Sequence, residues 1–229
     1  MKRIFWLLIS LFVFTIGLEA QIIRSDELEE YAKKKYGDNW LDAASNIGSK
    51  VELDKNNAIT FVQVIDCGNQ TKNQLYVILN YWFTSTFNQG DGNAIQLNDK
   101  EAGVIIARGF INDIAGHLGG GLNAYNVSIQ PVIKVDIRDG KVRVTYTVPY
   151  YVVEIMNGGG LTGVLLGTSV DSRKENWLLD QTYPFNEKDK HKKVSAKSLV
   201  MTNAFSNVVL DKIEEAVKNG MSGNENDEW

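Results

Sequence analysis

The residues that could carry nucleophilic or metal chemistry in this sequence are few and scattered. His117 stands in a glycine-rich run, "GHLGGG", and His191 stands in a lysine-rich run, "EKDKHKK", far away along the chain. Cys67 is the single cysteine, so no internal disulfide is expected. The motifs of a nucleophile elbow, a metalloprotease helix and a cysteine–histidine pair are all missing. We therefore expect no cofactor, no bound metal and no catalytic residue of these types.

Four carboxylates on or beside expected strands are the remaining candidates for acid–base chemistry, namely Asp66, Asp136, Asp139 and Glu154. A glycosidase needs two carboxyl groups about 5–10 Å apart. Spacing along the chain does not establish such a pair. A hydrolase acting on cell-envelope or glycan material thus remains an alternative, and an enzymatic role is the less favoured reading of the sequence.

The first twenty residues have the pattern of a secretory signal peptide. Lys2 and Arg3 precede an apolar run over residues 4–18, and a small residue, Ala20, stands at the expected cleavage site. The run is short for a membrane span, which needs about 20 apolar residues. We expect export to the periplasm, the cell surface or the medium; an uncleaved N-terminal anchor is the alternative. After cleavage no transmembrane helix is expected.

The overall charge argues against a nucleic-acid partner. The chain has 24 basic and 28 acidic residues, a formal net charge of −4. Loss of Lys2, Arg3 and Glu19 with the signal leaves 22 basic and 27 acidic residues, a net charge of −5. Nucleic-acid-binding domains have a basic footprint instead.

The elements expected from periodicity alternate between helices and strands. Residues 73–88, "NQLYVILNYWFTSTFN", form an uncharged helix whose Leu75, Ile78, Leu79, Trp82 and Phe83 share one face. We interpret this face as core, and we expect Val77 and Tyr81 to contact a late helix through Phe205 or Val209. The other expected helices cover residues 25–36 and 39–47, and a last helix runs from about Ser195 or Ser198 to Asn219. The expected strands cover residues 58–66, 93–98, 102–111, 124–138 and 141–155.

The two longest strands alternate apolar and polar residues around an Asp139-Gly140 turn, a strong hairpin signal. Because side chains of a strand point alternately to its two faces, the polar set should gather on one surface. Pro131 should mark an edge position or a bulge, because proline cannot donate to a ladder. The candidate binding surface on this hairpin consists of Gln130, Lys134, Asp136, Arg143 and Thr145.

The order of these elements resembles a known family. The stretches "YVILNYWFTSTF", "NAIQLNDKEAGVIIARGFI" and "YNVSIQPVIKVDIRDGKVRVTYT" look like the DUF4468 family, whose members are secreted or envelope proteins of Bacteroidetes without an established activity. The resemblance covers about residues 58–155. It implies an α+β fold like a half-repeat of the TATA-binding protein (TBP), with four to five antiparallel strands and helices packed on one face. Resemblance in fold does not imply DNA binding.

The expected organisation is a signal peptide at residues 1–20 and an N-terminal helical extension at 21–57. A single TBP-like α+β domain follows at 58–219, with an insertion around 156–195, and a disordered tail at 220–229. We expect an exported, non-enzymatic binding or interaction module. Its partner would be an envelope protein or a glycan.

Removal of the signal peptide is directly testable. Protein purified from the cell envelope should start at Gln21, because Ala20 is the expected cleavage site, and intact-mass measurement reads this start. Mature protein that retains Met1 would contradict the expectation.

Overall fold

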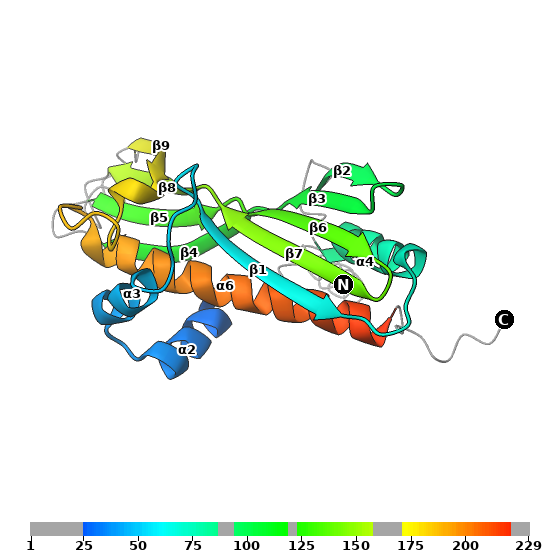
Figure 1. Cartoon of the computed structure of the whole chain (residues 1–229). Helices are drawn as coiled ribbons and strands as arrows, with labels where there is room; N and C mark the ends of the chain where they lie inside the picture. The colour runs from blue at the N-terminus through cyan, green and yellow to red at the C-terminus, as the bar shows by residue number, and fades with distance from the viewer. Residues whose placement is uncertain (1–24, 87–93, 119–122, 158–170, 221–229) are drawn as a thin grey trace, which may run out of the picture.

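The computed structural model describes residues 25–86, 94–118, 123–157 and 171–220, and these residues form two antiparallel sheets with helices (Figure 1). The expected α+β class is confirmed. The five-stranded sheet has the order β1-β7-β6-β3-β2, and a four-stranded sheet that was not expected has the order β4-β5-β8-β9. The strands are β1 (Ile59–Asp66), β2 (Ile95–Asp99), β3 (Val104–Arg108), β4 (Ile111–Leu118), β5 (Asn123–Ile129), β6 (Val132–Arg138), β7 (Lys141–Val148), β8 (Tyr150–Asn157) and β9 (Asp171–Leu178).

Two prolines divide the long hairpin between the sheets. Pro131 separates β5 from β6, and Pro149 separates β7 from β8. Since proline has no N–H to donate, neither ladder continues through these positions. The expectation of an edge or bulge at Pro131 was wrong, because β5 and β6 each have a neighbouring strand on both sides. The proline marks the change of sheet instead.

Strand β9 was missed from sequence. Its residues, "DSRKENWL", lack an apolar alternation, yet they pair with β8 along the whole strand. β9 is an edge strand. Polar and charged side chains are typical of such edges, where they discourage pairing with other chains.

The long helix α6 (Lys192–Asn219) runs along both sheets (Figure 1). Its 28 residues extend for about 42 Å at 1.5 Å per residue. It contacts β1 and β7 of one sheet and β4 and β5 of the other. The expected helix ending at Asn219 is confirmed, and it starts at Lys192, before both of the expected start residues, Ser195 and Ser198.

The two N-terminal helices cover the side of α6 that faces away from the sheets. They are α2 (Ser25–Tyr36) and α3 (Trp40–Gly48), close to the expected bounds. Leu28 and Ala44 are buried in the common core, and the Lys197 ammonium lies 2.7 Å from the Glu29 carboxylate. The division into an extension at 21–57 and a domain at 58–219 stays a prediction. Within the described residues, no helix is long and apolar enough to cross a membrane.

Helix α4 (Lys72–Thr86) contains the aromatic stretch, and its core face is as expected. Leu75, Leu79 and Phe83 are buried, whereas Trp82 is half-buried. Thr71 and Gln74 cap the helix start: the Thr71 N–H donates to Gln74 Oε1 at 2.9 Å, and the Gln74 N–H donates to Thr71 Oγ1 at 3.3 Å.

The expected second contact of α4 was wrong. Val77 is 48% exposed and Tyr81 is 64% exposed, while Phe205 and Val209 of α6 are buried elsewhere. Because α4 contacts β6 and α6 together, one apolar face fills the corner between sheet and helix. The opposite side of α4 therefore faces solvent.

The burial along α4 predicts graded losses of stability. Phe83→Ala should cost about 3–5 kcal/mol because it empties a buried aromatic site. Trp82→Ala should cost less, and Tyr81→Ala, the exposed control, should stay within about 0.5 kcal/mol of wild type. Urea denaturation midpoints measure these differences. Equal midpoints for the Phe83 and Tyr81 variants would contradict this packing.

Candidate binding surface

The five-stranded sheet has one face that none of the described helices covers, and we call it the open face. Helices α4 and α6 lie against the other face, where Ile133, Val144 and Tyr146 are buried. Residues paired across neighbouring strands point to the same side. The registers therefore place on the open face Thr60, Val62, Val64 and Asp66 of β1; Lys141, Arg143, Thr145 and Thr147 of β7; Val132, Lys134, Asp136 and Arg138 of β6; Val104, Ile106 and Arg108 of β3; and Leu97 and Asp99 of β2.

Four of the five residues chosen from the sequence meet on this face. Lys134, Asp136, Arg143 and Thr145 are neighbours across β6 and β7. Gln130 is not among them, because it lies between β5 and β6 and its Oε1 accepts a hydrogen bond from the Tyr150 hydroxyl at 3.0 Å. The binding role of these residues stays a prediction.

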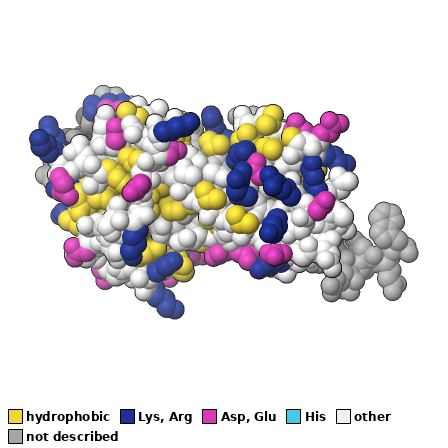
Figure 2. Space-filling view, viewed as in Figure 1, with side chains coloured by type: hydrophobic (Ala, Val, Ile, Leu, Met, Phe, Trp, Pro, Cys, Tyr) yellow, Lys and Arg dark blue, Asp and Glu magenta, His cyan; other side chains and the backbone are white. Residues whose placement is uncertain are grey.

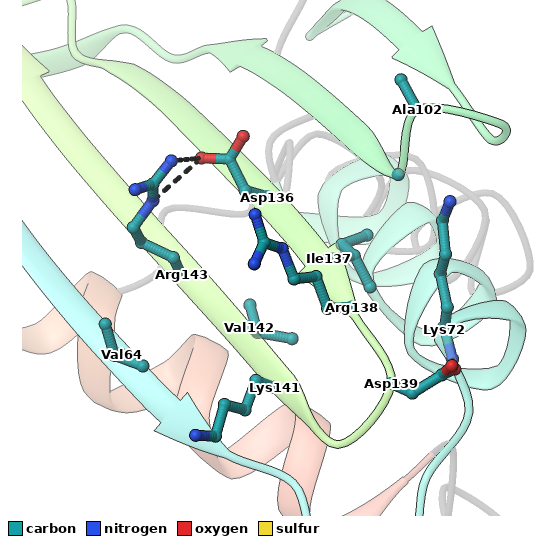
Figure 3. Close-up of a pocket in the computed structure, with 11 residues that line it drawn as sticks. Val64, Lys72, Ala102, Asp136, Ile137, Arg138, Asp139, Lys141, Val142 and Arg143 are labelled. Carbon is teal, nitrogen blue, oxygen red and sulfur yellow. Dashed lines mark hydrogen bonds and ion pairs between the residues drawn. The ribbon is translucent and has the colours of Figure 1, made fainter.

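Asp136 pairs with two of the cations on the open face, Lys134 and Arg143, and Figure 3 shows its contact with Arg143. Lys134 Nζ lies 2.8 Å from Asp136 Oδ1, and Arg143 donates to Asp136 Oδ2 from Nη2 at 2.8 Å and Nε at 3.1 Å. Burial raises the pKa of the Asp136 carboxyl, but the hydrogen bonds from Lys134 and Arg143 outweigh this and lower its pKa. This trio is internally paired, so a ligand would compete with Asp136 for either cation.

Two cations outside the candidate surface chosen from the sequence form no ion pair with a described residue. Arg138 and Lys141 face each other in the register at the hairpin turn, and they rise from the ends of β6 and β7 (Figure 3). Neither forms an ion pair or a side-chain hydrogen bond with a described residue. The signal that could have found them is the same period-two alternation, continued by one more step on each side of Asp139-Gly140.

These cations line a hollow of ≈ 560 Å³ at the end of the sheet. Lys72 at the start of α4 and Gly103 before β3 form another wall. The Lys72 backbone N–H donates to Asp139 Oδ1 at 2.7 Å, and its ammonium donates to the Glu101 carbonyl. The hollow is thus shared by the hairpin, α4 and the turn between β2 and β3.

The hairpin turn that carries the two cations is fixed by backbone contacts. Gly140 has φ +68, and its N–H donates to the Gln70 carbonyl at 2.8 Å. Its own carbonyl accepts from the Cys67 N–H at 2.8 Å. A Cβ at Gly140 would lie 2.6 Å from the Gly68 carbonyl oxygen, so only glycine allows this approach. Arg138 and Lys141 therefore stand on a well-supported turn.

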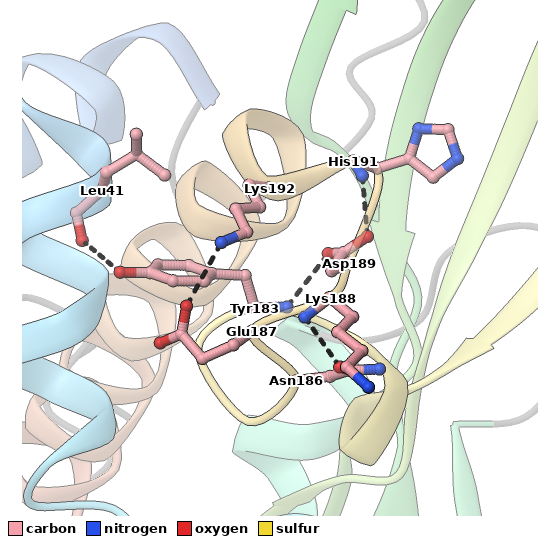
Figure 4. A network of polar contacts seen from close by, with 8 residues as sticks. All are labelled: Leu41, Tyr183, Asn186, Glu187, Lys188, Asp189, His191 and Lys192. Carbon is pink, nitrogen blue, oxygen red and sulfur yellow. Dashed lines mark hydrogen bonds and ion pairs between the residues drawn. The ribbon is translucent and has the colours of Figure 1, made fainter.

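The lysine-rich run at 187–193 has a structural role (Figure 4). Asp189 accepts from the Tyr183 N–H at 3.0 Å, the His191 N–H at 2.7 Å and the Ser195 hydroxyl at 2.5 Å. Lys192 pairs with Glu187 at 3.2 Å. Asp189 and Lys192 thus organise the first turn of α6. This network explains why α6 starts earlier than the sequence predicts.

His191 packs among aromatic rings, and the backbone of His117 lies in a strand. His191 stacks on Trp177 with ring centroids 4.8 Å apart and lies 4.9 Å from Tyr125. His117 belongs to β4 rather than to a loop as expected; both glycine runs, 119–122 and 158–161, lie outside the described residues. Cys67 is buried directly after β1, as expected, and burial raises the pKa of its thiol.

Of the candidate carboxylates, Asp136 and Asp139 line the same hollow, and each of them is engaged in a structural contact. Asp66 Oδ1 accepts from the Gly68 N–H at 2.9 Å, Asp139 accepts from Lys72, and Asp136 is held by its two cations. Glu154 lies in the four-stranded sheet. Across the described ranges, no three His, Cys, Asp or Glu side chains are grouped as metal ligands.

The described residues form an α+β fold, and one stretch of the chain matches a family model with a TBP-like fold. Residues 61–151 match the sequence model of DUF4468, a domain of unknown function with a TBP-like fold, which confirms the resemblance inferred from the sequence. The match spans β1 to the start of β8 and includes the hollow. None of the curated proteins compared with this chain is similar to it.

Two solved structures are similar to this chain at low identity. A TBP-like protein from Parabacteroides distasonis ATCC 8503 is 11% identical with a TM-score of 0.45, and 73% of this chain and 97% of that chain are covered. A DUF4468 family protein from Bacteroides ovatus ATCC 8483 is 16% identical with a TM-score of 0.47, and 81% of this chain and 94% of that chain are covered.

The lowered pKa of Asp136 predicts a pH-dependent contribution to stability. A carboxyl whose pKa is lower in the folded state stabilises the protein above its unfolded pKa, and this contribution is lost as pH falls through the folded pKa. At pH 7, the free energy of unfolding of the wild type should exceed that of Asp136→Asn by up to about 1 kcal/mol. This difference in unfolding free energy should shrink when the pH is well below 3.8, the ordinary pKa of an aspartate carboxyl. Urea unfolding of both proteins at pH 7 and at about pH 2 measures it, and a difference that persists unchanged at low pH would contradict the network.

Proposed function

We propose that this chain is an exported, non-enzymatic binding module of the cell envelope, and that its partner binds the open face. The signal-peptide pattern of residues 1–20 supports export. The single observation that carries the binding role is an uncovered sheet face on which exposed apolar and cationic side chains are neighbours. Val62 is 59% exposed, Val64 is 63% exposed and Leu97 is 48% exposed, all on this face.

Exposed apolar side chains that gather on one surface are a feature of protein interaction sites. Three of the seven large hydrophobic residues exposed in the described structure lie on the open face. Figure 2 views the molecule from this side and shows dark-blue Lys and Arg side chains beside yellow apolar ones. Such a mixture suits a protein partner, which offers both apolar and polar groups.

The alternative of an envelope hydrolase has less support from the geometry. Of its candidate carboxylates, Asp136 is paired with two cations and Glu154 lies in the other sheet. A glycosidase dyad requires two carboxyl groups about 5–10 Å apart on either side of a substrate bond. Asp136 and Asp139 line the same hollow, but Asp136 is paired with Lys134 and Arg143, and Asp139 accepts a hydrogen bond from the Lys72 backbone N–H.

Site-specific photo-crosslinking tests the proposed binding face. A benzophenone amino acid replaces Val62 or Thr145 on the open face, or Tyr81 on the exposed side of α4 as the control. After illumination in intact cells, the two open-face positions should yield the same discrete adduct, because both lie under one partner. The adduct is identified by mass spectrometry, and the purified partner should rebind wild type.

The control position decides the outcome. Tyr81 is 64% exposed, against 59% for Val62 and partial exposure for Thr145, so chance encounters would label it at least equally. Adducts of equal yield and identity from all three positions, or no adduct from the open face, would contradict the proposal.

A further inference from the structure

The cations Arg138 and Lys141 are an unbalanced pair. Like charges directly opposite on neighbouring antiparallel strands destabilise a sheet. The nearby Lys134 and Arg143 share the Asp136 carboxylate. Asp66 lies opposite Lys141 in the β1–β7 register, but neither Arg138 nor Lys141 forms an ion pair with a described residue, so the two cations outnumber the one carboxylate beside them. A bound anion would remove this repulsion, so the pair favours a ligand with negative charge.

The surroundings of the pair strengthen this preference. The hollow is lined by four cations, Lys72, Arg138, Lys141 and Arg143, and by two carboxylates, Asp136 and Asp139. Its formal charge is therefore +2 in a protein whose net charge is −4. A local surplus of cations on an acidic protein attracts and orients an anionic partner.

The geometry points to an acidic peptide segment of the partner as the ligand of this hollow, an inference that rests on the proposed function. One carboxylate of the segment would accept two parallel hydrogen bonds from the Arg138 guanidinium. A second carboxylate would pair with Lys141 or Lys72 across the hollow. An apolar side chain of the segment would cover Val64, which lines the same hollow and is exposed.

Other anionic partners fit the surface less well. A flat anionic membrane would also meet Asp66 and Asp99, which lie exposed on the same face. A nucleic acid would meet the same carboxylates on a protein without a basic footprint. An acidic glycan offers no apolar side chain for Val62 and Val64. A peptide can place acidic and apolar groups alternately, as the open face does.

Fluorescence anisotropy with defined peptides tests the inference on the mature chain, residues 21–229. The probe is a labelled octapeptide with four Glu and two Val residues, and its control has Gln in place of Glu. Wild type should bind the acidic probe at least tenfold more tightly than the Gln peptide. Binding should weaken as salt rises, because exposed charges are screened.

Charge-reversal variants locate the binding to the hollow. Arg138→Glu/Lys141→Glu should weaken binding of the acidic probe about tenfold or more, since two attractions become repulsions. Lys34→Glu/Lys50→Glu makes the same change of net charge at exposed sites away from the sheet and should stay within about twofold of wild type. The milder variant, Arg138→Gln/Lys141→Gln, should weaken binding several-fold. Because it removes the two positive charges without adding negative ones, it tests the site even if the charge-reversed protein misfolds.

Three results would overturn the inference. They are equal binding of the Glu and Gln peptides, equal loss of binding in the control variant, and displacement of the probe by inorganic phosphate or phosphatidylglycerol vesicles at matched anion concentration. The proposed function is judged separately. If the open-face adducts persist in Arg138→Glu/Lys141→Glu, the binding face stands and the acidic-peptide inference falls.

Discussion

The burial of α6 against both sheets is the constraint on which the rest of the structure depends. Leu199 and Phe205 are buried, and small polar residues such as Ser198, Thr202 and Ser206 are buried as well. The helix is thus enclosed by the sheets on one side and by α2 and α3 on the other. Apolar burial contributes roughly 25 cal/mol per Å², so a helix of this length enclosed on two sides is a large part of the core energy.

This arrangement decides where binding can occur. Each sheet has two faces, and α6 occupies one face of both. The residues on the opposite face of the five-stranded sheet therefore do not pack in the core with α6. The contacts of Gly140 with Gln70 and Cys67 fix the hairpin end, so its cations are positioned before any partner arrives. A preorganised site loses less conformational entropy on binding.

Charge pairing divides the open face into two parts. Around Asp136, Lys134 and Arg143 share one carboxylate, and this trio stabilises the folded state. At the hairpin end, neither Arg138 nor Lys141 forms an ion pair with a described residue, although Asp66 lies opposite Lys141 in the register. The same strands thus carry a structural network and a candidate recognition site side by side, separated by one step of the strand alternation.

Strong local patterns in the sequence determined most elements and part of the surface. The capping pair Thr71 and Gln74, the apolar face of α4 and the Asp139-Gly140 turn all act within a few residues. Alternation likewise placed Lys134, Asp136, Arg143 and Thr145 on one face. Tertiary structure alone decided the rest: the proline-divided second sheet, the pairing of polar β9, the exposure of Val77 and Tyr81, and which cations find a counter-charge. The physical reason is that these depend on contacts between segments distant in sequence, and local patterns carry no information about such partners.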